Sequence, residues 1–375
     1  MLRTVLASFA VVAALAAGAA VAQEVPVTEC DQRAANPLDP DAAAPGVALA
    51  AVQPEAAVAA CEAAVAQYPG TLRLIYALGR AYDAAERYEE AMKAYSAASK
   101  AGYAASFNNI GRFFDYGLGV ARNPETAAAW YEKGIALNSG SAMLGLAVLI
   151  ETGGLGTPDP ERAASLIRDA AALDHAEGVF MLGKMYESGH SVERDMKEAE
   201  RLYVRAAELG SANGAFAAGM LYVNGGSGLD TDFVKAKSYF EAAAASGFSQ
   251  AMYNLGVIAE RGYAGEPDLE AAYGHYVAAA ERGNAGAMFN LGALYETGRG
   301  VEQDHESAAY WAIESLVAGD SFAIDTMRAG AEPFSPEFRT EVQKILTTLG
   351  VYNGATDGEW GVATLLAIED VIGSP

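Results

Sequence analysis

Cysteine and histidine are scarce in this chain of 375 residues, which has two cysteines and four histidines. The histidines are scattered, and none has the spacing of an H-E-x-x-H motif or of a cysteine and histidine zinc site. They are His175, His190, His275 and His305. The motifs G-x-S-x-G and S-x-x-K and the phosphate-binding P-loop are also missing. We therefore expect no catalytic residue, no metal and no cofactor.

Positive charge is also in short supply. There are 25 Lys and Arg against 48 Asp and Glu, which gives a formal net charge of -23. Nucleic-acid binding depends on Lys and Arg displacing counterions, so we expect no nucleic-acid partner. The charge is compatible with a neutral or basic protein partner. A solvated acidic surface without any partner is the alternative.

Long hydrophobic runs are confined to residues 1–22. This stretch has one basic residue, an apolar run from Val5 to Ala17, and Ala20 and Ala22 in an A-x-A arrangement. The pattern is typical of a secretory signal peptide cut after Ala22. An uncleaved anchor is the alternative, although the run is short and rich in alanine. We therefore expect a periplasmic protein with no membrane span after signal cleavage.

Both cysteines, Cys30 and Cys61, lie near the start of the expected mature chain. In an oxidising compartment we expect them to form one disulfide, which would contribute roughly 3 to 4 kcal/mol by restricting the unfolded chain. The alternative is a pair of small buried thiols. The bond would join an N-terminal segment, residues 23–53, to a helix that begins near Pro54. We expect that segment to be extended because it is rich in Pro, Ala and Asp.

What the sequence does have is a repeat of about 36 residues. In residues 180–210, apolar residues at spacings of three and four predict two amphipathic helices and a loop. The position of Gly183 recurs at Gly79, Gly111, Ala147, Gly219, Gly256 and Gly292. This regularity predicts an all-α fold, a right-handed α-solenoid over residues 54–329. It would hold about seven helix pairs and an N-terminal cap helix.

Two further repeated positions mark the ends of each second helix. Asn or Asp at the start can accept hydrogen bonds from first-turn N–H groups; the residues are Asn123, Asp159, Asp195, Asp232, Asp268 and Asp304. The residues that close the helix adopt the left-handed conformation at low cost; they are Gly102, Asn138, Asp174, Gly210, Gly247, Gly283 and Gly319. The glycine inside each first helix costs about 1 kcal/mol against alanine. We expect it to allow a close approach of the two helix backbones, with pairs such as Ala206 and Ala207 facing it.

Aromatic residues also recur at fixed positions. They are Tyr82, Phe114, Tyr186, Tyr222 and Tyr295 in first helices, and Tyr95, Tyr131, Tyr203, Phe240 and Tyr276 in second helices. We interpret them as core residues; a ladder for stacking a ligand is the alternative. The third repeat has Ala147 for the glycine and Ile150 for the aromatic residue, which predicts different packing or a bend there.

The motifs LGKMYESG, LGVIAERG and LGALYETGRGVEQD resemble the Sel1-like repeat family, which is related to tetratricopeptide repeats but has a longer period. The resemblance implies a non-enzymatic scaffold whose curved surface binds another protein. We expect that partner to be an envelope protein of unknown identity. Cysteine-rich members of the family bind β-lactams, but their disulfide in each repeat is missing here.

The last segment, residues 333–375, follows a different pattern. Ser335 and Pro336 predict a helix start, and the string LGVYNGATDGEWGVAT resembles the peptidoglycan-binding-like domain, a small three-helix unit. The resemblance implies that peptidoglycan binds through four residues: Tyr352, Asn353, Asp357 and Trp360. Val362 stands where that family usually has Pro. The alternative is that Tyr352 and Trp360 form the core of a very small domain.

These features together predict a non-enzymatic periplasmic scaffold that mediates protein–protein interaction in the cell envelope and is tethered to peptidoglycan. One alternative is a cell-wall-binding accessory or activator of a peptidoglycan-active enzyme. Another is a wall-binding structural protein in which the C-terminal unit is the main functional part.

Overall fold

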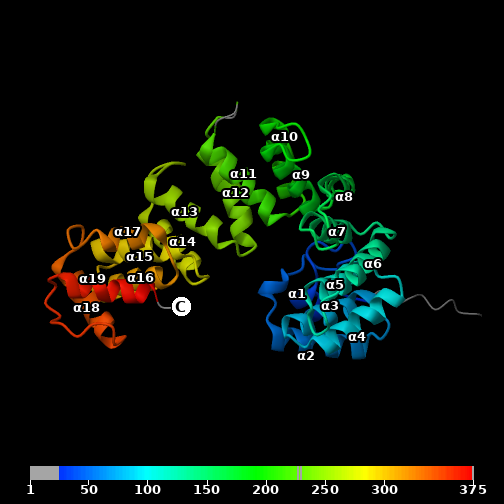
Figure 1. Cartoon of the computed structure of the whole chain (residues 1–375), viewed down its shortest axis with the longest axis horizontal. Helices are drawn as coiled ribbons and strands as arrows, with labels where there is room; N and C mark the ends of the chain where they lie inside the picture. Colours follow the sequence, from blue (N-terminus) through cyan, green and yellow to red (C-terminus); the bar gives the residue numbers. More distant parts are fainter. Residues whose placement is uncertain (1–24, 226–227, 229, 374–375) are drawn as a thin grey trace, which may run out of the picture.

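The computed structural model describes residues 25–225, 228 and 230–373, and all regular secondary structure in these residues is helical. The helices follow one another along an arch, with α1 to α6 at one end and α13 to α19 at the other (Figure 1). The predicted all-helical solenoid is confirmed. The predicted signal peptide, residues 1–22, lies outside the described residues.

Seven helix pairs form the solenoid. The first helices are α3 (Leu72–Ala84), α5 (Ala104–Tyr116), α7 (Gly140–Glu151), α9 (Ala176–Ser188), α11 (Ala212–Asn224), α13 (Ser249–Arg261) and α15 (Ala285–Thr297). The second helices are α4 (Tyr88–Lys100), α6 (Pro124–Ile135), α8 (Pro160–Ala172), α10 (Met196–Glu208), α12 (Phe233–Ala245), α14 (Leu269–Ala280) and α16 (His305–Val317). Helix α2 (Pro54–Gln67) packs on α3 at the N-terminal end.

The first helices line the inner side of the curve. Most successive first helices contact each other: α5 contacts α7, α7 contacts α9, α9 contacts α11 and α13 contacts α15. Successive second helices do not reach comparable contact in the described residues. Elements that approach most closely from repeat to repeat lie on the inside of a curved solenoid. The concave surface is therefore made by first helices.

The repeated polar residues cap the second helices as predicted. Each of the six Asn and Asp residues accepts a first-turn hydrogen bond; Asp304, for example, accepts from the N–H groups of Glu306 and Ser307 at 3.0 and 3.2 Å. The seven closing residues have positive φ angles, from 54° at Asp174 to 90° at Gly210. Local sequence therefore determines where each second helix begins and ends.

The glycine inside each first helix makes room for an aromatic ring, and the expected approach of backbones or alanine pairs is wrong for most repeats. A Cβ atom at Gly183 would lie 2.7 Å from Cε1 of Tyr203, and the other repeats with a second-helix ring are alike. Gly292 is the exception, because Ala312 replaces the ring there and a Cβ would lie 2.9 Å from the carbonyl oxygen of Ala308. A ring that lies against a helix needs a position without a side chain. The second-helix rings are buried, as predicted.

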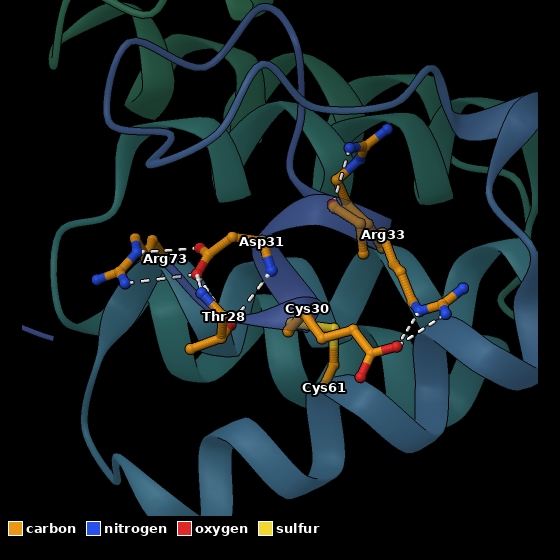
Figure 2. Close-up of a disulfide and its surroundings, with 9 residues drawn as sticks. Thr28, Cys30, Asp31, Arg33, Cys61 and Arg73 are labelled. Atoms are coloured by element: carbon orange, nitrogen blue, oxygen red, sulfur yellow. Dashed lines mark hydrogen bonds and ion pairs between the residues drawn. A yellow bond between two sulfur atoms is a disulfide. The ribbon is translucent and has the colours of Figure 1, made fainter. Parts of the chain in front are cut away.

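The N-terminal segment, predicted to be extended, contains helix α1 (Glu29–Ala34) and a 3-10 helix, Leu49–Ala51. Thr28 and Asp31 form a reciprocal capping box that starts α1 despite its short length. The predicted disulfide between Cys30 and Cys61 joins α1 to α2, with Cα atoms 4.5 Å apart (Figure 2). Asp31 also pairs with Arg73 of α3 at 3.0 Å, so the segment is tied to two helices.

The C-terminal segment contributes two helices of its own within the described residues, α18 (Pro336–Thr348) and α19 (Val362–Ile372), where a three-helix unit was predicted. Between the solenoid and this segment, α17 (Ser321–Arg328) is only eight residues long. Helix α18 packs directly on α16, and Phe338 shares one apolar cluster with Ala308 and Ala312. The segment therefore covers the last repeat, because the short α17 leaves the apolar flank of α16 open.

Candidate functional site

A pair of interacting side chains recurs inside the solenoid. The ring that lies on the first-helix glycine carries a hydroxyl, and this hydroxyl donates to a carboxylate four residues after the glycine. Tyr203 donates to Glu187 at 2.6 Å and Tyr276 to Glu260 at 2.9 Å. Burial, and then the carboxylate, raise the pKa of both tyrosines far above the usual value, so the hydroxyls keep their protons. Tyr95 with Asp83 and Tyr131 with Asp115 are further pairs.

Three repeats depart from this pairing. The fifth repeat has Phe240 and Val223, so the hydroxyl and the carboxylate are lost together. The third repeat has Ile167 with Glu151, and the seventh has Ala312 with Glu296. These two repeats keep the carboxylate and lack the tyrosine that would bind it. The sequence carried this signal in the regular carboxylate position, and the sequence analysis missed it.

In the seventh repeat the C-terminal segment takes the place of the tyrosine. The backbone N–H of Ser335 donates to one oxygen of Glu296 at 3.1 Å, and Nδ1 of His305 lies 2.7 Å from the other. Phe334 and Phe338 line the same site beside Ala312. The side chain of Glu296 is accordingly only 13% exposed.

In the third repeat the smaller Ile167 stands at the tyrosine position and leaves space beside it. A hollow of about 510 Å³ lies among α7, α8 and α9. Its apolar lining includes Ala163, Ala164, Ile167, Phe180, Met181 and Met185. Glu151 lies at its edge with 44% of its side chain exposed, and Nε2 of His190 is 3.5 Å away. This hollow is the different packing that the sequence predicted for the third repeat.

Aromatic residues also recur on the first helices, which make the concave face, three positions before the first-helix glycine. Phe180, Phe216 and Tyr253 are partly exposed there. Near the C-terminal end, Phe322 is 67% exposed and meets Phe289 edge-on at 5.6 Å beside a hollow of about 450 Å³. No role was predicted for this position, although its spacing is as regular as that of the buried rings.

The N-terminal segment occupies the first part of the first-helix face. The buried guanidinium of Arg80 donates to the carbonyl oxygens of Ala34 and Val47 at 2.9 and 2.7 Å. Farther along, the hydroxyl of Tyr103 donates to Asp39 at 2.6 Å, and burial raises the pKa of this carboxyl. The accessible part of the concave face therefore begins beyond the first repeats.

A serine and a histidine meet where α7 and α9 begin, as in a nucleophile and its base. The Oγ of Ser141 lies 3.0 Å from Nε2 of His175, and Nδ1 of the ring accepts the N–H of Gly178 at 3.3 Å. The ring proton is therefore on Nε2, which donates to Ser141 and cannot remove its proton. Burial lowers the pKa of His175 to about 4. We interpret the contact as structural, linking two repeats.

The four residues predicted to bind peptidoglycan lie in the loop between α18 and α19. Tyr352 is buried, and its hydroxyl donates to the carbonyl oxygen of Ala355 at 2.8 Å. Trp360 is half-buried and packs on Phe334 with ring centroids 5.4 Å apart. Asn353 and Asp357 are exposed. The two aromatic residues thus serve as packing residues, and binding to peptidoglycan stays a prediction.

Buried Gln343 of α18 holds this turn, and the sequence analysis missed it. Its Nε2 donates to the carbonyl oxygen of Glu359 at 2.9 Å and to Oγ1 of Thr364 at 3.2 Å, while its Oε1 accepts the N–H of Gly358 at 2.8 Å. A lone glutamine in a helix carries no periodic signal, so only its burial identifies it.

Across the described ranges, no cluster of three or more His, Cys, Asp or Glu residues is arranged to hold a metal ion. The same residues contain no helix that combines the length and hydrophobicity needed to span a membrane.

Six consecutive stretches match the Sel1 repeat: residues 108–139, 140–175, 176–211, 212–248, 249–284 and 285–315. Together they cover more than half of the sequence. The chain belongs to the Sel1 repeat family. The sequence-based assignment to this family is confirmed, and the pair α3 and α4 lies outside the matched stretches.

Solved Sel1 structures share the fold. A Sel1 repeat protein from Oxalobacter formigenes is 30% identical over 63% of this chain and 97% of its own, with a TM-score of 0.56. A protective antigen of uropathogenic Escherichia coli with an SLR fold is 25% identical over 86% of this chain and 71% of its own, with a TM-score of 0.58. No curated relative matches. Sel1 repeat proteins are generally non-enzymatic scaffolds for protein–protein interaction.

Proposed function

We propose that this Sel1 protein is a periplasmic scaffold that binds a segment of another envelope protein on its concave face and is tethered to peptidoglycan by its C-terminal segment. The row of partly exposed aromatic side chains on successive first helices carries this proposal. Such residues supply most of the binding energy in protein interfaces when they lie in hollows on a curved surface.

The partner should be neutral or basic. The chain has a net charge of -23, so an acidic partner would be repelled.

The disulfide between Cys30 and Cys61 supports export, because such bonds persist in oxidising compartments. Mass spectrometry of the protein from envelope fractions of its own cells should find Gln23 as the first residue. An N-terminus that retains residues 1–22 would contradict the predicted cleavage.

Site-specific photocrosslinking in envelopes of the native cells tests the concave face. A benzophenone side chain in place of Tyr253 should give a discrete crosslinked product. The matched control is Tyr310 of α16, which is 48% exposed on a second helix and should give none. The same products from both positions, or none from Tyr253, would contradict the proposed binding surface.

Sedimentation with insoluble peptidoglycan tests the tether. Removing the C-terminal segment would expose the apolar flank of α16, so point changes at exposed residues are the better probe. We expect Asn353→Ala with Asp357→Ala to release the full chain into the supernatant. Glu359→Ala, on the same exposed turn, is the control and should sediment like the unchanged protein. No sedimentation of the unchanged protein would remove the tether and leave the protein-binding role.

A further inference from the structure

The seventh repeat shows how an unpaired carboxylate of this solenoid is used. Ala312 leaves the space that a tyrosine fills in other repeats, and Glu296 loses its usual hydroxyl donor. A non-repeat segment then supplies both missing parts, with Phe334 and Phe338 in the space and the backbone N–H of Ser335 on Glu296. The chain is thus its own example of a segment bound in this position.

The third repeat has the same two changes without an occupant. Ile167 stands at the tyrosine position, as Ala312 does, and Glu151 stands where Glu296 does. The hollow here is about 510 Å³, whereas about 210 Å³ remains beside Phe334 and Phe338 in the seventh repeat. Glu151 is 44% exposed against 13% for Glu296. The third repeat therefore offers both space for a side chain and a carboxylate that can accept a hydrogen bond.

The geometry points to the hollow of the third repeat as a docking site for an extended segment of a partner protein. In our proposal the segment places an aromatic side chain among Ala163, Ala164 and Ile167 and donates a backbone N–H to Glu151. This inference rests on the proposed scaffold function and names the chemistry of what it binds.

Charge around the hollow determines the rest of the segment. Three glutamates line it: Glu151, Glu177 and Glu187. Lys184 is the lysine in the same lining. Glu187 already accepts from Tyr203, and Glu177 accepts from Ser211 and Asn213. Glu151 has only the longer contact with Nε2 of His190, at 3.5 Å, so it is the glutamate best placed to accept from an incoming donor. Acidic rims favour basic residues beside the aromatic anchor.

A synthetic peptide with the sequence of residues 333–336 between two basic residues, Lys-Pro-Phe-Ser-Pro-Lys, is the probe. Its binding to the full chain is measured by fluorescence anisotropy against the matched peptide with Ala in place of Phe. We expect the phenylalanine peptide to bind at least tenfold more tightly, because the ring supplies the buried apolar area.

Two variants locate the binding. Ala147→Gly with Ile167→Tyr rebuilds the pairing found in the other repeats, so the ring should fill the hollow, engage Glu151 and weaken binding at least tenfold. Glu151→Gln should weaken it several-fold, and Glu161→Gln, exposed on α8 outside the hollow, should leave it unchanged. Circular dichroism and thermal melting verify that each variant folds.

Equal binding of the two peptides, or undiminished binding by the folded rebuilt variant, would overturn this docking site. The crosslink from Tyr253 separates that result from failure of the scaffold role. If the rebuilt variant still crosslinks a partner at Tyr253 but no longer binds the peptide, both proposals are supported. A retained crosslink with no peptide binding by the unchanged protein rejects the docking site alone.

Discussion

The two ends of the solenoid are closed by different chemistry. At the N-terminal end an irregular segment is tied down by a disulfide, the pair of Asp31 with Arg73, and the buried guanidinium of Arg80. At the C-terminal end α18 and α19 cover α16 through apolar packing around Phe338. A terminal repeat has no neighbour to bury its apolar flank, so each end needs a cover. The comparison shows that a short irregular segment is held on the terminal repeat by specific polar and covalent links. Packed helices are held there by the apolar area that they bury.

Breaking the apolar cover should have the largest effect. Phe338 is 2% exposed, and Phe338→Ala should lower the free energy of unfolding by about 3–5 kcal/mol, since it removes a buried ring and leaves a cavity. Urea unfolding followed by tryptophan fluorescence measures this. Leu366→Ala on α19, where the side chain is 61% exposed, should change stability by less than about 0.5 kcal/mol. Equal losses for the two variants would mean that the C-terminal helices are not a packed cover.

Breaking the covalent link should have the next largest effect. Replacing both Cys30 and Cys61 by Ser should cost about 2–4 kcal/mol, because the unfolded chain regains the freedom that the bond removes. Thermal melting with and without reductant measures the change. Reduction should destabilise the unchanged protein by a similar amount and leave the double variant unaffected. If reductant also destabilises the double variant, the loss of stability does not come from this disulfide.

Acid should weaken the packing of α7 against α9, where His175 is buried. His175 has a pKa lowered by burial to about 4, against about 6.5 when unfolded, so below pH 6.5 only the unfolded chain gains this proton. The contribution of His175 to the free energy of unfolding should fall by about 2 kcal/mol as the pH is lowered from 6.5 to 5. Hydrogen exchange of α7 and α9 measures the loss. His175→Gln should flatten this pH dependence, and an unchanged dependence would show that other groups cause it.

The interior of the solenoid should respond least. Tyr203→Phe removes the hydrogen bond to Glu187 and should cost about 1 kcal/mol. The double change Tyr203→Phe with Glu187→Val copies the pairing of Phe240 and Val223 in the fifth repeat and should recover most of the loss. Urea unfolding compares the two variants. A double variant less stable than Tyr203→Phe would contradict the idea that ring and carboxylate act as a unit.

Much of the fold could be read from local sequence. The residues that start and end second helices act on their own backbone, so Asp304 and Gly210 could be assigned without knowing their neighbours. The role of Gly183 was assigned wrongly because its constraint comes from a ring 20 residues away. The Gln343 contacts and the Glu296 contact with Ser335 were missed for the same reason.

The sequence by itself determined that helix pairs stack in series, because caps, glycines and apolar spacing are local and recur in six or seven of the repeats. Only the tertiary structure decided which exceptions matter. The losses of tyrosine at Ile167 and Ala312 look alike along the chain, yet one place is filled by the C-terminal segment and the other is open. Occupancy depends on which distant segments come together in space, and a repeating local pattern carries no information about that.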